Sequence, residues 1–139
     1  ILVDSIGVGS GVVDRLREIG LPVRGVNVAE APSTKKNYLN LRAELWFAIK
    51  DWLAQRDCRL PNNDELASEL AAPQYKYTSS GKIKIESKDE MRKRGIKSPD
   101  KADALALTMA SSAASFGGSQ AFMGYNFKKP LKSRIFRVG

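Results

Sequence analysis

Three aspartates carry the pattern that most directly suggests chemistry. Asp4 follows a short apolar run, and Asp100 and Asp103 stand three residues apart near the end of the patterned sequence. Helical spacing of three residues places both carboxylates on one face of a first turn. Asp4 would end a buried strand, which is where α/β sheets place their active sites. Carboxylate oxygens suit Mg²⁺ or Mn²⁺, and two such ions activate water and clamp a phosphodiester. The pattern predicts carboxylate–metal hydrolysis by Asp4, Asp100 and Asp103.

Helix capping is a simpler interpretation of the Asp100–Asp103 pair. Acidic side chains near a helix N-terminus interact favourably with the helix dipole, which accounts well for Asp100. It accounts less well for Asp103, because Ala102, Ala104 and Leu105 suggest burial around it. A buried carboxylate needs a cation or a metal as partner. Both interpretations stay open at this point.

The composition excludes several other kinds of catalytic site. The chain has 139 residues, no histidine and a single cysteine, Cys58. It therefore lacks a Ser–His–Asp triad, a Cys–His pair, a histidine-ligated zinc and a disulfide framework. No apolar run is long enough for a membrane helix, and no basic leader precedes the apolar start. Catalysis would have to use carboxylates, hydroxyls, amines or a bound metal.

A glycine-rich segment at residues 5–11 follows the first apolar run. Gly7, Gly9 and Gly11 lie between an expected strand and an expected helix, the context in which a helix N-terminus binds phosphate. However, the dinucleotide motif needs glycine where this chain has Val12, and the Gly-Lys pair of a phosphate-binding loop is absent. We expect a tight strand-to-helix turn, with a nucleotide-binding domain as the weaker alternative.

The net charge of +8 is concentrated in two blocks. Residues 1–75 have a net charge of −1, residues 76–101 have +5, and residues 121–139 have five basic side chains and no acidic one. Local positive charge attracts polyanions, so nucleic acid is the expected partner, although a solvated surface would have the same composition. The candidate contacts to a nucleic-acid backbone are Lys82, Lys84, Lys88, Arg92, Lys93, Arg94 and Lys97.

The elements that would position these residues follow from periodicity and capping signals. Residues 39–53 form the strongest amphipathic pattern, with Trp46 and Trp52 expected in the core and Arg42 and Glu44 as a possible ion pair. Ser98 is the expected N-cap of the last helix. The full expectation is a strand at 1–3, a helix at 12–19, a strand at 23–28, helices at 39–53 and 64–70, a hairpin at 75–85, and helices at 87–94 and 98–109.

Four segments together resemble the C-terminal nuclease domain of the large terminase subunit of tailed bacteriophages. They are residues 3–14, 40–46, 81–91 and 94–108, so the resemblance covers about residues 1–110. It implies an RNase H-like fold with a mixed sheet flanked by helices, and an endonuclease that uses two Mg²⁺ or Mn²⁺ ions to cut concatemeric double-stranded DNA. Asp4 resembles the fourth-strand acid of the family, and Asp100 and Asp103 resemble its helix acids. Residues 111–139 would be a Ser/Gly/Ala linker and basic tail.

The resemblance also implies partners and a missing part. The family works with an ATPase motor domain of the same protein, a portal and a small terminase subunit, in the bacterial host cytoplasm, as a viral or prophage protein. In an RNase H-like domain three strands, the first with an essential aspartate, precede the strand expected to end at Asp4. The sequence therefore predicts a catalytically incomplete nuclease domain that lacks its first strands. A non-catalytic DNA-binding or assembly module using the two basic blocks is the alternative.

Overall fold

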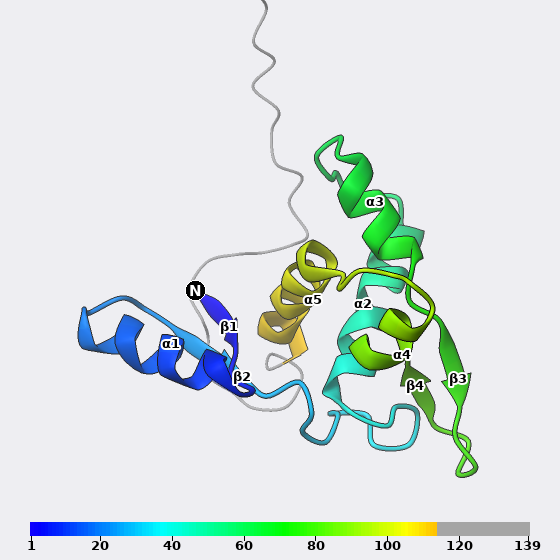
Figure 1. The fold of residues 1–139 in the computed structure, drawn as a ribbon, viewed down its shortest axis with the longest axis horizontal. Coiled ribbons are helices and arrows are strands. Elements are labelled where there is room, and N and C mark those ends of the chain that lie inside the picture. Colours follow the sequence, from blue (N-terminus) through cyan, green and yellow to red (C-terminus); the bar gives the residue numbers. More distant parts are fainter. Residues whose placement is uncertain (114–139) are drawn as a thin grey trace, which may run out of the picture.

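The computed structural model describes residues 1–113, which form an α/β arrangement of short strands and helices (Figure 1). The predicted α/β class is confirmed. The predicted basic tail lies outside the described residues. None of the helices in residues 1–113 is long and apolar enough to cross a bilayer. In chain order the elements are β1 (Leu2–Asp4), α1 (Val8–Glu18), β2 (Arg24–Val26), α2 (Leu41–Ala54), α3 (Asp64–Ala71), β3 (Tyr75–Tyr77), β4 (Ile83–Ile85), α4 (Lys88–Lys93) and α5 (Asp100–Ala113).

The N-terminal unit is the predicted strand–helix–strand motif. Strands β1 and β2 pair in parallel, with Leu2 opposite Arg24, and α1 connects them. The helix begins at Val8, earlier than predicted, so the glycine-rich segment is partly helical. Gly7 has a φ of 60°, a conformation that favours glycine, and it turns the chain directly from strand to helix. The expected tight turn is therefore confirmed but shorter than predicted.

Helices α2 and α5 pack against each other in the centre of the molecule (Figure 1). On α5, Ala102, Ala106 and Ala110 recur every fourth residue and are buried, so their small side chains let the two helices approach closely. The Asn40 side chain caps α2 by accepting a hydrogen bond from the Ala43 N–H at 3.1 Å. The remaining core residues come mainly from α2, with β2, α3 and β4: Val26, Leu41, Ala43, Leu45, Trp46, Ile49, Leu66 and Ile85.

The predicted hairpin is present, but the strands do not form one mixed sheet. Strands β3 and β4 pair antiparallel, while β1 and β2 form a separate two-stranded sheet. The two sheets lie on opposite sides of the α2–α5 pair (Figure 1). Tyr38 bridges to Ile83 and so occupies the second edge of β4. Strands β1 and β2 therefore do not pair with β4 at this edge. The expectation of a single sheet is therefore wrong for residues 1–113.

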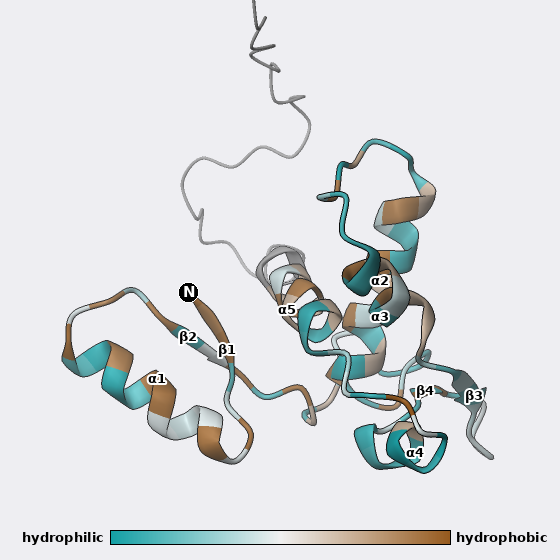
Figure 2. Cartoon of the chain, turned by 45° about the horizontal axis from the view of Figure 1, so that its top comes forward, coloured by the Kyte–Doolittle hydropathy of each residue, from teal (hydrophilic) through white to brown (hydrophobic). Residues whose placement is uncertain are grey.

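The two helices near the site begin in different ways. Ser87 caps α4 in a capping box with Glu90. In contrast, α5 begins at Asp100, and the Ser98 hydroxyl donates to the Asp100 carboxylate at 2.6 Å instead of accepting a backbone N–H. The first turn of the helix is closed by a backbone hydrogen bond from the Asp103 N–H to the Pro99 carbonyl at 2.7 Å. Helix α4 is coloured mainly as hydrophilic in Figure 2.

Candidate carboxylate site

One cavity of about 500 Å³ is lined by all three predicted aspartates. Asp4 reaches it from the end of β1, and Asp100 and Asp103 reach it from the first turn of α5. Helix α2 contributes Arg42 and Trp46 to the same wall, and α4 contributes Lys88. Ser87 and six apolar residues complete the lining, the latter being Ile6, Val28, Leu45, Ala104, Ala106 and Leu107. The structure therefore brings together acids that lie almost a hundred residues apart in the sequence.

Asp4 is held at the strand end by the turn that follows it. Its Oδ1 accepts a hydrogen bond from the Ile6 N–H at 3.1 Å, which fixes the carboxylate beside the turn. Its carbonyl oxygen lies directly against Gly9, because a Cβ built on Gly9 would fall 1.7 Å from that oxygen. Only glycine at this position lets α1 start so close to β1. The glycine-rich segment therefore positions Asp4, which is a structural role.

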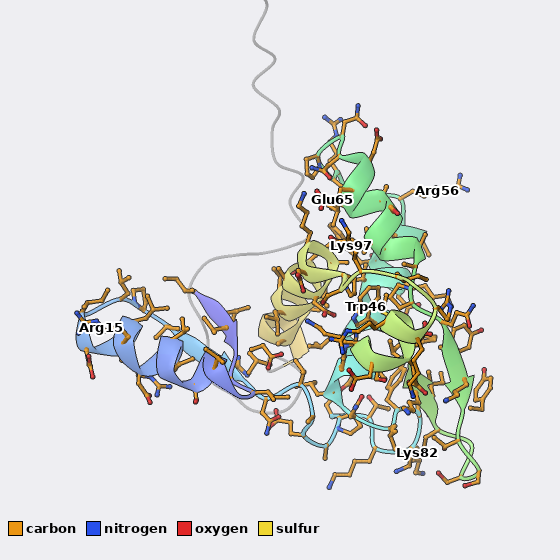
Figure 3. The ribbon with its side chains drawn as sticks, in the orientation of Figure 1. Arg15, Trp46, Arg56, Glu65, Lys82 and Lys97 are labelled. Atoms are coloured by element: carbon orange, nitrogen blue, oxygen red, sulfur yellow. The ribbon has the colours of Figure 1, made fainter. Side chains whose placement is uncertain are left out.

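Asp103 has the most partners of the three acids. Its Oδ1 accepts from the Trp46 indole N–H at 3.0 Å and lies 3.3 Å from Arg42 Nη2. Its Oδ2 lies 3.3 Å from Lys88 Nζ. The Asp103 side chain is 22% exposed and the Arg42 side chain 15%, so this pair is shielded from water more than a surface ion pair. Figure 3 shows Trp46 at the centre of the molecule, near α2 and α5.

The position of Arg42 corrects the predicted ion pair with Glu44. Arg42 binds Asp103 and also donates to the Glu86 carbonyl at 2.6 Å. Glu44 points elsewhere and accepts hydrogen bonds from the Ser33 and Thr34 backbone N–H groups. Side chains two residues apart on a helix point in different directions, so Arg42 and Glu44 do not face each other and bind different partners.

Asp100 is exposed and is linked to Asp103 through Lys88. The Lys88 ammonium lies 3.3 Å from Asp100 Oδ1 and at the same distance from Asp103 Oδ2. The Ser98 hydroxyl, followed by Lys88, lowers the pKa of Asp100 below the usual value for aspartate. The predicted placement of both acids on one face of the helix is confirmed by this shared partner. Capping alone does not describe the pair, because both side chains bind the same cation.

The donor set has the chemistry that a hard divalent cation prefers. The acids offer only oxygen, and they surround one cavity. Within residues 1–113, however, no three His, Cys, Asp or Glu side chains are grouped closely enough to hold one ion. Lys88 and Arg42 neutralise the helix acids in this arrangement. The three aspartates therefore suit a metal because they offer oxygen donors and line one cavity. In this structure Lys88 bridges Asp100 and Asp103.

The predicted backbone-binding residues divide into two groups. Lys88 bridges the helix acids, and three others pair with acids of the same block: Lys84 with Glu90, Arg92 with Asp89, and Arg94 with Glu86. Across residues 1–113, Lys82, Lys93 and Lys97 make no salt bridge. Figure 3 shows Lys82 and Lys97 well apart. The block is thus a distributed set of charges and not one compact patch.

Two residues of the site were missed by sequence reasoning. Trp46 was expected only in the core, and Arg42 was assigned to another partner. Both lie on α2 four residues apart, so they share one helix face. An arginine and a tryptophan N–H on the buried face of a helix are donors that need acceptors, and that signal was available in the sequence.

The fold of this chain is similar to that of the nuclease domain of a phage large terminase subunit. Solved structures similar to this chain include those of gp2 of bacterial virus Sf6. Its nuclease domain has 26% sequence identity to this chain with a TM-score of 0.65, and a mutant form with manganese and β-thujaplicinol has 25% with a TM-score of 0.66. A mutant form with calcium also has 25%, with a TM-score of 0.65.

Each of these matches covers 78% of this chain and 63% of the solved one. The chain thus spans less than two thirds of the length of the nuclease domains that it matches. No family profile matches the sequence, and no curated protein matches it. The structural similarity confirms the resemblance inferred from the sequence motifs, and it supports a nuclease role.

Proposed function

We propose that this chain is an RNase H-like, metal-dependent endonuclease domain of a viral DNA-packaging terminase. The observation that carries the proposal is the single cavity lined by Asp4, Asp100 and Asp103, in a chain whose structure resembles a terminase nuclease domain. Solved relatives were studied with manganese and with calcium, which supports a divalent cation as cofactor. The substrate would be concatemeric double-stranded DNA.

The three aspartates would hold two Mg²⁺ or Mn²⁺ ions. Such ions lower the pKa of an attacking water and stabilise the charge that develops on a phosphodiester. Arg42 and the Trp46 N–H fix the Asp103 carboxylate, so its orientation is set before a ligand arrives. Lys88 lies between the two helix acids, where its ammonium can also contact an incoming phosphate.

The remaining cations of residues 76–101 would hold the DNA backbone beside the acids. Lys82, Lys93 and Lys97 are the candidates with the weakest internal competition, because they make no salt bridge within residues 1–113. The proposal extends to the wider assembly: an ATPase motor domain of the same protein, a portal and a small terminase subunit, in the cytoplasm of the bacterial host. Residues 1–110 as the nuclease unit and 111–139 as linker and basic tail remain predictions.

Metal binding tests the proposal without depending on turnover. We expect the 139-residue chain to bind Mn²⁺, measured as loss of the free-ion signal in electron paramagnetic resonance. Asp100→Asn and Asp103→Asn should each weaken binding by about tenfold or more, because each removes an anionic ligand. Asp89→Asn is the matched control, since Asp89 is an exposed acid of α4 that pairs with Arg92 and does not line the carboxylate cavity. Equal Mn²⁺ affinity in all four proteins would contradict the proposal.

A DNA cleavage assay tests the proposed nuclease activity itself. Either helix-acid substitution should abolish Mn²⁺-dependent nicking of supercoiled plasmid by a protein in which this chain is preceded by the three strands that the family resemblance implies. Undiminished nicking by both would remove these acids from the mechanism. DNA binding that falls with salt but is indifferent to EDTA, with no Mn²⁺ binding, would instead favour the non-catalytic DNA-binding module.

A further inference from the structure

A second cavity adjoins the carboxylate cavity through Lys88, which lines both. Its volume is about 450 Å³. The lining comes from α4 and from the segment that links α4 to α5: Lys88, Arg92, Gly95, Ile96, Lys97 and Ser98. Three of these six residues are cationic, one is a hydroxyl, and none is acidic. The charge of the lining alone indicates an anionic ligand.

Internal partners take up little of this charge. Within residues 1–113, Arg92 makes one salt bridge, to Asp89 at 2.9 Å, and both side chains are 78% exposed, so the pair is weak. Lys97 makes no salt bridge within residues 1–113. Lys88 is shared with the helix acids across the boundary between the cavities. Arg92 and Lys97 are therefore available to a ligand.

The chain turn after α4 builds the cavity. Gly95 has a φ of 73°, the left-handed conformation that ends helices, and its N–H donates to the Arg92 carbonyl at 2.9 Å. The Ile96 N–H donates to the Met91 carbonyl at 3.0 Å. These two bonds fold the chain back over the end of α4. Arg92 on the helix and Lys97 beyond the turn consequently line the same cavity.

We propose that this second cavity binds one backbone phosphate of the nucleic acid whose neighbouring phosphodiester lies at the carboxylate cavity. The assignment of the neighbouring phosphodiester rests on the proposed nuclease function. The two cavities share Lys88, whose Nζ lies 3.3 Å from Asp100 Oδ1, and this oxygen also accepts from the Ser98 hydroxyl at 2.6 Å. A polyanionic strand that crosses this point meets the acids on one side and the cations on the other.

Phosphate fits this lining better than a side-chain carboxylate does. A guanidinium binds two phosphate oxygens at once, and an ammonium and a hydroxyl can satisfy the others. A nucleic-acid strand also supplies phosphates at regular spacing, so one can occupy this cavity while another lies beside the acids. The cavity would thus fix the register of the strand relative to the acids.

The first test uses dimethyl phosphate, a phosphodiester without bases, added to the metal-free 139-residue chain. In ¹H–¹⁵N correlation spectra the amide signals of residues 95–98 should shift saturably. Arg92→Gln and Lys97→Gln should each weaken binding by about fivefold, the effect of about 1 kcal/mol for an exposed charge contact. Lys50→Gln is the matched control, because it removes the same charge from an exposed position of helix α2 that lines neither cavity.

The spectra also report whether each variant is folded, so a loss of binding can be separated from unfolding. Equal weakening by Lys50→Gln and Lys97→Gln, absence of shifts at residues 95–98, or equal shifts with acetate at matched ionic strength would overturn the proposal. Binding of a short DNA duplex in EDTA, followed by fluorescence anisotropy, should show the same order of variants. If acidic peptides bind more tightly than the duplex, the cavity is a protein-docking site and the proposal is wrong.

These outcomes are separable from those of the nuclease proposal. Phosphate binding is measured without metal and does not involve Asp4 or Asp103. Failure of Mn²⁺ binding with intact phosphate binding would remove the nuclease assignment and keep the anion site. Intact Mn²⁺ binding with no phosphate binding would support the metal site and contradict phosphate binding in the second cavity.

Discussion

The contact between Gly9 and Asp4 leads to a sharp prediction about the glycine-rich segment. A Cβ at position 9 would lie 1.7 Å from the Asp4 carbonyl oxygen, whereas a Cβ at position 11 has nothing within 4 Å. Both glycines lie inside α1, so both substitutions to alanine bring the same gain in helix propensity. Only Gly9→Ala also forces two backbone segments apart. The pair therefore isolates the effect of that close approach.

The magnitude follows from the geometry. Because real Cβ contacts below 3.0 Å essentially do not occur, the start of α1 must move away from β1 by about 1.3 Å, the difference from 1.7 Å. Overpacking of this kind costs about 1–3 kcal/mol. Replacing a helical glycine by alanine gains about 0.5–1 kcal/mol. We expect Gly11→Ala to be stabilising by that amount, and Gly9→Ala to lie about 1–3 kcal/mol below it in free energy of unfolding, because the propensity gain is common to both.

Urea unfolding followed by tryptophan fluorescence measures this difference. A second readout is Mn²⁺ affinity, which should fall in Gly9→Ala because Asp4 moves with its carbonyl, and should not change in Gly11→Ala. Equal stability of the two variants would refute the positioning role of Gly9. A stable Gly9→Ala protein that loses nucleotide binding would instead support a phosphate-binding turn.

Two further predictions concern the partners of the site and of α4. Trp46→Phe should lower the free energy of unfolding by about 2 kcal/mol, because the Asp103 carboxylate loses an N–H donor at 3.0 Å; urea unfolding tests this, and a loss below about 0.5 kcal/mol would contradict it. The Lys76 ammonium, followed by Ser87, lowers the pKa of Glu90 from 4.5 to about 2. The stability that Glu90 adds is therefore complete above about pH 4.5 and is lost as the pH falls towards 2. Glu90→Gln should be less stable than the native chain above pH 4.5, with the difference shrinking on acidification; a difference independent of pH would exclude this linkage.

Local signals in the sequence were sufficient for much of the fold. The order of elements from β1 to α5 follows from periodicity, from caps such as Asn63 before α3 and Ser87 before α4, and from the glycine turns. These signals act within a few residues, so they are readable without tertiary structure. The grouping of Asp100 and Asp103 on one face was predictable for the same reason, since helical spacing alone sets it.

The contacts between distant segments were not predictable in this way. Nothing local shows that Arg42 and Trp46 meet Asp103, because this depends on how α2 packs against α5. The separation of the strands into two sheets depends on the Tyr38 bridge, which occupies the second edge of β4. Lys88 was assigned to phosphate on the basis of charge, and its position between two acids follows from the tertiary fold. Pairing across more than about forty residues requires the packed structure.

A crystal structure of the chain soaked in Mn²⁺ tests the central claim most directly, which is that the aspartates of β1 and α5 form one metal site. We expect anomalous density for Mn²⁺ in the cavity between Asp4 and the Asp100–Asp103 turn, with Lys88 displaced from at least one of its two carboxylates. An empty cavity at saturating Mn²⁺, with the Lys88 ion pairs intact, would contradict it.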